Sequence, residues 1–363
     1  MNKKFSVLLV VFVFVLTGVG ATFAQVKKTG QTGKRTVAGK AVVKAQANQL
    51  AARLPNSDAV INVEMARLMN EALPQMLATK PQHLEEINAK IDEIKSNIGI
   101  DLRQFEQIAV GIAYKTISPK ETDFEPVILA RGKFNSGAYL GLAKVAAKGK
   151  YREEKIGEKT VYVFSPKEIM AQNKPAGKDS FITKMIDKAM QSFNQEIAVA
   201  GFDDNTLVMG SLKRVREAFE SETRVSARVL DLAAKNSTAM LSFGANMPAG
   251  AAQFLPLEND ELGKNIASIN EVYGALDYTG GKATLLAAAR TGKAEDAQSL
   301  EETLLGLQMV GKALLGASKG ADKQLYSRLI ENAVIARKTN EVSFNLTMPK
   351  TDIDALMAIL LKN

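Results

Sequence analysis

Four times along this chain, two stretches rich in β-forming residues are joined by a turn and lead into a helical segment. The turns carry residues that tight hairpins prefer, such as Asp203, Asp204 and Asn205 in the second pair. Antiparallel hairpins followed by helices predict an α+β fold with the helices packed on one face of the sheet. The paired stretches are 107–114 with 126–134, 196–202 with 206–210, 272–278 with 283–290, and 334–338 with 342–348.

The helices of this pattern have recognisable beginnings and ends. Asn135 and Ser211 are good N-caps, and an apolar stripe over 81–98 is followed by Gly99, a residue that commonly ends helices. A wide apolar stripe normally faces a core, so for the helix predicted over 294–315 we favour packing across the sheet. The alternative is a face for lipid or for a partner helix. That stripe consists of Leu300, Leu304, Leu307, Val310 and Leu314, widened by Leu305, Met309 and Leu315.

The order of these segments predicts two copies of one module. We expect the first module at 51–230 and the second at 231–363, each with two hairpins that lead into helices. The correspondence is one of pattern rather than identity, so coincidence is the alternative. The matched stretches are 130–133 with 289–293, 197–200 with 333–336, and, more weakly, 58–63 with 238–243.

The first 24 residues have the layout of a cleavable secretory signal. Lys3 and Lys4 precede a 12-residue stretch, 5–16, that is apolar except for one serine, and Ala24 supplies a small residue before Gln25. A bilayer core of about 30 Å needs about 20 residues, so we favour a cleaved signal over an uncleaved anchor. We expect a periplasmic or extracellular protein after cleavage near Ala24 and Gln25.

The positive charge of the chain is concentrated at its beginning. Residues 1–57 contain nine Lys or Arg and no acidic residue, so the total of +8 leaves residues 58–363 at −1. A duplex-binding protein needs clustered Lys and Arg on its folded part, and we therefore predict no nucleic-acid partner. Residues 25–50 are predicted to be a disordered basic tail, which acts as a solvated spacer or makes weak electrostatic contact with a membrane.

Two formal catalytic motifs lack the context that their chemistry needs. Residues 316–320 fit G-x-S-x-G, but a helix precedes Ser318 and the single histidine, His83, lies upstream. Residues 306–313 resemble a phosphate loop, but Ala313 replaces the Ser or Thr that would hold Mg²⁺, and the segment lies within a predicted helix. The chain contains no cysteine, which excludes disulfides, thiolate chemistry and a lipid attached to cysteine. We predict no catalytic residues.

Acidic residues offer no spacing that is typical of a metal or cofactor site. Three neighbours, Asp203, Asp204 and Asn205, form the best local cluster, yet the fourth hairpin turn is Thr339 and Asn340 without acids, so turn chemistry explains both. We therefore predict no metal and no cofactor. We predict that the carboxylate pairs lie on the solvated surface. Catalytic carboxylates, however, have no characteristic spacing in a sequence, so catalysis by carboxylates stays open. These pairs are Glu153 with Glu154, Glu220 with Glu222, and Glu301 with Glu302.

Three stretches, 54–60, 131–134 and 151–164, resemble a group of uncharacterised exported bacterial proteins with a duplicated α+β module. The resemblance implies export and a duplicated fold. It brings no catalytic or ligand-binding residues, so none is transferred to this chain.

Together these features predict an exported, non-enzymatic protein that binds an envelope protein or an apolar ligand. One alternative is a carrier that holds a lipid or another apolar molecule between helix and sheet, for which we expect a large enclosed apolar cavity. Another is a hydrolase that uses carboxylates, for which we expect converging carboxyl groups with a raised pKa.

Overall fold

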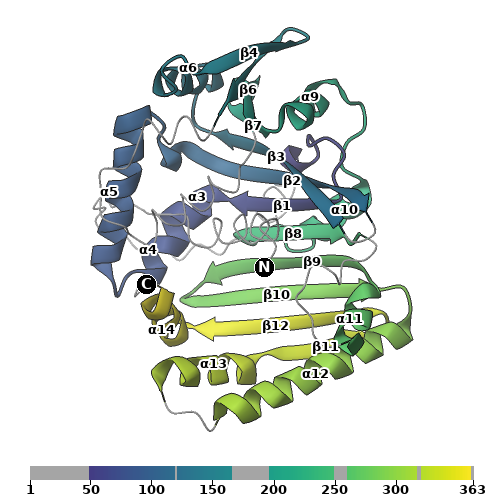
Figure 1. Cartoon of the computed structure of the whole chain (residues 1–363). Helices are drawn as coiled ribbons and strands as arrows, with labels where there is room; N and C mark the ends of the chain where they lie inside the picture. The colour runs from purple at the N-terminus through teal and green to yellow at the C-terminus, as the bar shows by residue number, and fades with distance from the viewer. Residues whose placement is uncertain (1–48, 119–120, 166–195, 249–259, 317–319, 361–363) are drawn as a thin grey trace, which may run out of the picture.

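The computed structural model describes residues 49–118, 121–165, 196–248, 260–316 and 320–360, and their strands form one antiparallel sheet (Figure 1). The sheet has 12 strands. In spatial order they are β11 (Val334–Lys338), β12 (Glu341–Pro349), β10 (Lys282–Thr291), β9 (Ile269–Thr279), β8 (Leu241–Asn246), β1 (Ala59–Glu64), β2 (Phe105–Ser118), β3 (Glu121–Gly132), β7 (Thr206–Gly210), β6 (Ile197–Asp203), β5 (Lys159–Phe164) and β4 (Tyr151–Ile156).

All four predicted hairpins are confirmed. They are β2 with β3, β6 with β7, β9 with β10, and β11 with β12, and each pair is antiparallel. The stretch 238–243, which the sequence matched weakly to 58–63, overlaps β8, and this strand begins at Leu241. The sequence pattern missed the hairpin of β4 and β5, whose alternation is obscured by four consecutive charged or polar residues at 152–155.

The predicted helices are present, with the expected caps. Asn135 and Ser211 each accept a hydrogen bond from the backbone N–H three residues on, and Gly99 adopts a left-handed φ of 76° at the end of α5. The π-helical turn Leu68–Ala72 and the 3₁₀ turn Leu102–Gln104 add to the helices. The helices are α3 (Met65–Arg67), α4 (Leu73–Met76), α5 (Pro81–Ile98), α6 (Ser136–Ala146), α9 (Leu212–Glu220), α10 (Ala227–Ala234), α11 (Asp260–Ala267), α12 (Ala294–Gly316), α13 (Ala321–Asn332) and α14 (Lys350–Leu360).

Helices cover both faces of the sheet, which corrects the expectation that they share one face. Side chains alternate along β1, so Ile61 and Val63 enter one buried cluster and Val60 enters another. The first cluster receives α5 and α14, and the second receives α9 and α10. The physical reason is that the central strands are apolar on both sides, and each side needs its own cover.

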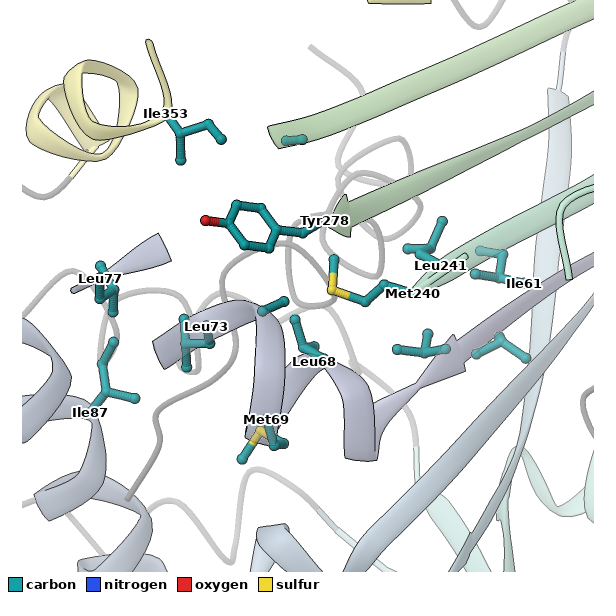
Figure 2. Close-up of a cluster of buried hydrophobic side chains, with 14 of the residues drawn as sticks. Ile61, Leu68, Met69, Leu73, Leu77, Ile87, Met240, Leu241, Tyr278 and Ile353 are labelled. Atoms are coloured by element: carbon teal, nitrogen blue, oxygen red, sulfur yellow. The ribbon is translucent and has the colours of Figure 1, made fainter. Parts of the chain in front are cut away.

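The two halves of the chain meet in a continuous sheet and a shared core. Strand β1 pairs with β2 on one side and with β8 on the other, so Ile61 lies opposite both Val110 and Phe243. Figure 2 shows Leu68 and Leu73 from the first half beside Met240 and Tyr278 from the second, all within one cluster. The predicted boundary at 230–231 therefore falls inside α10, whose Leu232 packs on Tyr273 in β9.

Strand order is the same on the two sides of the central pair, but other features differ. Going outward, β1-β2-β3-β7-β6 corresponds to β8-β9-β10-β12-β11, after which the first half continues with β5 and β4. Each half has a helix after its last shared hairpin, α9 in the first half and α14 in the second. These two helices lie on opposite faces of the sheet, because α9 packs with Val60 and α14 packs with Ile61.

The part of the chain that the structure describes begins at residue 49. Gln49, Leu50 and Ala51 start a short helical turn, and Leu50 is buried in the cluster that contains Val60. This corrects the end of the range predicted as a tail, 25–50, because an apolar side chain that can reach the core becomes ordered there. The predicted signal at 1–24 and the rest of the tail lie outside the described residues. Within the described ranges, no helix combines the length and apolarity needed to cross a membrane.

Candidate interaction surface

The first half of α12 packs on the sheet as its stripe predicts. Ala297 and Leu300 are buried against Val342 of β12, and Leu304 joins the same cluster. Asn265 of α11 holds the helix from the side, because its amide donates to Ser299 O at 3.2 Å and to Thr303 Oγ1 at 2.8 Å. Position and direction of α12 are therefore set before residue 305.

The second half of α12 runs past the edge of the sheet and packs on α13. The amide Nε2 of Gln308 donates to Ile330 O and Ala333 O, each at 2.8 Å, and Gly311 faces Ile330. Figure 1 shows α12 extending beyond the edge strand β11, with α13 beside it. Only one side of this half is covered in the part of the chain that the structure describes.

The uncovered side is apolar over three turns. Met309 and Leu314 are 69% and 70% exposed, and Val310 is 52% exposed. Helical spacing places residues 305, 306, 309, 310, 313 and 314 on one side of the helix, opposite Gln308 and Gly311. We call this side the α12 apolar surface; it consists of Leu305, Gly306, Leu307, Met309, Val310, Ala313 and Leu314.

The same side of the helix is polar in its first half. Glu295, Gln298, Ser299 and Glu302 are all exposed there. The change from polar to apolar therefore occurs at residue 305, directly after Leu304, the last residue of α12 in the cluster with the sheet, although solvent would favour charged residues there. Surface helices keep polar residues toward water, and a local reversal over several turns marks a place that another molecule covers.

This arrangement corrects half of the expectation for the stripe. Leu300 and Leu304 face the sheet, whereas Leu307, Val310 and Leu314 are exposed. Periodicity identifies an apolar face, but it carries no information on where the sheet beneath the helix ends. The signal that could have located the surface is the loss of charged residues, since Lys312 is the sole charged residue between 303 and 316.

The two formal motifs occupy this region. Residues 306–313 are helical throughout, within α12, and no strand leads into them, as expected. Gly316 ends α12, also as expected, and Ser318 lies outside the described residues.

A charged cluster lies at the other side of the same half of the sheet. Glu271 is 1% exposed and is paired with Arg290 at 2.9 Å and with Arg228. Glu341 accepts hydrogen bonds from Tyr273 at 2.7 Å and Arg290 at 2.8 Å. Burial by itself would raise the pKa of Glu341, but these bonds, together with one from Lys235, lower it. An ionised and fully paired carboxylate serves structure rather than proton transfer.

Among the described residues, one carboxyl group has a raised pKa, that of Glu64 at the end of β1. Burial raises it above the ordinary value of 4.5, although Gln107 donates a hydrogen bond at 3.0 Å and Arg67 lies nearby, and both of these lower it. Two open pockets of about 490 and 310 Å³, each lined by polar and apolar atoms in similar share, lie elsewhere on the molecule, and Glu64 lines neither.

Those pockets differ from the apolar cavity that a lipid carrier needs. The larger one is lined by charged side chains that pair with one another, as Lys213 does with Glu125 at 2.7 Å. Arg214 also lines this pocket and donates to Ser57 Oγ at 2.8 Å, which ties α9 to the segment before β1. The smaller pocket lies on β10 and β12 and includes Thr284, Asn345 and Thr347.

The other acidic candidates lie apart from one another. Asp203 forms an ion pair with Arg53 at 2.6 Å, and its carboxylate accepts from the N–H of Asn205 within the β6–β7 turn. His83 lies at the start of α5 beside Glu86, 3.3 Å away. Across the described ranges, no group of three acidic, His or Cys side chains is arranged to hold a metal ion.

The carboxylate pairs lie on the surface and form ion pairs or hydrogen bonds of their own. Glu153 contacts Lys144 at 3.2 Å, and Glu220 contacts Arg216 at 3.5 Å. Glu301 accepts from Arg337 at 2.9 Å, whereas Glu302 accepts from Gln298. The structure therefore brings none of these pairs together with another.

The fold defines an α+β protein built on a single antiparallel sheet, and its comparisons with known proteins are distant. Three crystal forms of TP0453, a protein of Treponema pallidum, are similar over 86–87% of this chain and 97–98% of their own. The TM-scores are 0.41, 0.42 and 0.39, and sequence identity is 9% in each case. No family model matches the sequence, and no curated protein matches it either.

Proposed function

We propose that this is an exported, non-enzymatic binding protein of the cell envelope, and that its partner docks on the α12 apolar surface. The observation that supports the proposal is the exposure of Leu307, Met309 and Leu314 on a helix whose preceding turns are polar on the same side. Soluble proteins rarely expose contiguous apolar side chains without a partner for them. The remainder of α12 is anchored on the sheet, so the surface is held ready for docking.

Export and the double module belong to the same proposal. The signal pattern at 1–24 supports export, and the common strand order around β1 and β8 supports a duplicated module. The intact mass of the protein recovered from periplasm or medium tests export, with Gln25 as the expected first residue. The duplication is tested by superposing the strands β1, β2, β3, β7 and β6 on β8, β9, β10, β12 and β11. If the strand order agrees only by chance, the superposed Cα positions should deviate strongly.

Photo-crosslinking in intact cells tests the docking surface. A photoreactive amino acid replaces Met309 in one variant and Gln298 in the other. Both positions lie exposed on α12, but Gln298 belongs to the polar half. We expect a discrete crosslinked adduct from position 309 and none from position 298.

Adducts that form equally from both positions, or from neither, would contradict the proposal. The double variant Met309→Gln with Leu314→Gln provides a further control, with the photoreactive group at position 305. Loss of the adduct in this variant is expected because amide side chains prefer water to an apolar contact. Since both side chains are exposed, the variant should keep its melting temperature.

A further inference from the structure

We infer that the partner of the α12 apolar surface is a second copy of this chain, bound through antiparallel pairing of the two α12 helices. The inference rests on the proposed function, since it names the occupant of the same surface. It is carried by the order of large and small side chains along the exposed side of the helix.

That order reads the same in both directions. The six positions that helical spacing places on this side, between the flanking Leu307 and Lys312, are Leu305, Gly306, Met309, Val310, Ala313 and Leu314, which is large, small, large, large, small, large. The midpoint lies between residues 309 and 310. A two-fold axis through this point places residue 305 opposite residue 314 of the second copy, 306 opposite 313, and 309 opposite 310. Such self-complementarity is what a closed two-fold interface requires.

The small residues lie where two helices would come closest. Gly306 and Ala313 are seven residues apart, or two turns, at the centre of the exposed side. A Cβ atom built on Gly306 would meet nothing within 4 Å, so the space above the glycine is open. Small residues at a helix interface let the two backbones approach closely, and the large residues on either side then interdigitate.

Gly311 shows that the glycines of this helix differ in role. A Cβ atom at Gly311 would lie 3.0 Å from Ile330 of α13, so that glycine serves packing within the chain. Gly306 serves no contact within the described residues. A glycine inside a helix is less stabilising than an alanine. Gly306 is explained if the space above it receives a side chain of the second copy.

The interface is small, and we expect reversible association. Three exposed turns per copy bury less surface than a standard protein interface of about 1,600 Å². We therefore expect a dissociation constant on the order of 1–100 µM, the range of weak and transient contacts.

Single cysteines test the geometry directly, because the chain contains none of its own. In the antiparallel pair, residues 309 of the two copies lie beside the axis, within reach of a disulfide. Residues 306 lie about 10 Å apart along the helix axis, beyond that reach, but each lies opposite residue 313 at the centre of the interface. Under mild oxidation, the Met309→Cys variant should form covalent dimers by itself. The Gly306→Cys variant should form them only when mixed with the Ala313→Cys variant.

Gln298→Cys is the matched control, since it is exposed on the same helix outside the surface. Dimers of the Gly306→Cys variant by itself would indicate parallel pairing and would overturn the proposed geometry. Equal dimer formation by the Gln298→Cys variant would indicate random collision and would overturn the inference as well.

Gly306→Leu tests the close approach without cysteine. The substitution enters open space and should leave the folded monomer intact, but it fills the centre of the interface. Light scattering after size-exclusion chromatography at 100 µM should show at least a tenfold weaker dimer. Gly141→Leu is its control, because that helical glycine also has nothing within 4 Å of an added Cβ. An unchanged dimer in the Gly306→Leu variant would overturn the inference.

The two proposals fail separately. A purified protein that stays monomeric and uncrosslinked overturns self-pairing, and an adduct from position 309 with another envelope protein in cells would then still support the proposed function. Dimers of the purified protein, with an in-cell adduct of twice the mass of one chain, support both. Loss of every adduct from position 309 in cells contradicts the proposed function.

Discussion

Glu341 contributes to stability as an ionised side chain, because Tyr273, Arg290 and Lys235 all donate hydrogen bonds to it. We expect Glu341→Gln to lower the free energy of unfolding at pH 7 by about 1–3 kcal/mol, the usual effect of removing a charged hydrogen-bond partner. Because the pKa of Glu341 is lowered in the fold, its contribution is present above the unfolded value and is lost as pH falls through the folded value. Urea unfolding at pH 7 and pH 3 measures the difference.

Glu302→Gln serves as the control, since Glu302 is exposed and accepts only from Gln298 among the described residues. Its effect on unfolding should lie within about 0.5 kcal/mol. A difference between the Glu341→Gln variant and the wild type that does not shrink from pH 7 to pH 3 would show that the side chain acts by packing.

Glu64 behaves in the opposite way. Burial raises its pKa, so its ionised form is less favourable in the fold than in the unfolded chain. Glu64→Gln should therefore stabilise the protein at pH 7, by about 0.5–2 kcal/mol, the usual range of a single stabilising substitution. The gain should fade as pH falls through the raised folded value, and it should be gone below the ordinary value of 4.5, where Glu64 is protonated in both states. Thermal unfolding across this pH range checks the prediction, and a gain independent of pH would contradict it.

At the scale of elements, two glycines in neighbouring helices make a matched pair. Gly99 ends α5 at a φ of 76°, and an added Cβ would lie 2.6 Å from Leu142 of α6. Gly99→Ala should therefore destabilise the fold by about 1–3 kcal/mol. Gly141→Ala, in the open middle of α6, should instead stabilise it by about 0.5–1 kcal/mol. Chemical denaturation measures the free energy of unfolding of both variants. A change of the same sign in both would show that the left-handed φ of Gly99 does not control this helix end.

At the scale of the whole molecule, the two halves should unfold together. They share the β1–β8 pairing and a buried cluster that contains Leu73 and Leu241. We expect one calorimetric transition, with equal calorimetric and van't Hoff enthalpies. Leu241→Ala, which removes about 2–5 kcal/mol from that cluster, should shift the whole transition rather than split it. Two separate transitions would indicate halves that fold independently.

Much of the fold could be predicted from neighbouring residues, but the missed elements show the limits. The turn residues at 203–205 and 339–340 and the caps Asn135 and Ser211 located hairpins and helices correctly. The helices α10 and α11 have eight residues each, too few for periodicity to separate them from loops. The candidate interaction surface could be predicted only in part. The sequence shows the apolar stripe on α12, but its periodicity favours packing of the whole stripe against the core.

The sequence by itself determined the local structure of this protein: four hairpins, the helix caps, the absence of cysteine and the concentration of positive charge before residue 58. These depend on residues that are neighbours along the chain. Only the tertiary structure decided that helices cover both faces, that Ile61 of β1 lies opposite Phe243 of β8, and that α12 outruns the sheet. Those properties depend on contacts between residues far apart in sequence, where burial of apolar area acts on whole surfaces and no local pattern records which surface remains uncovered.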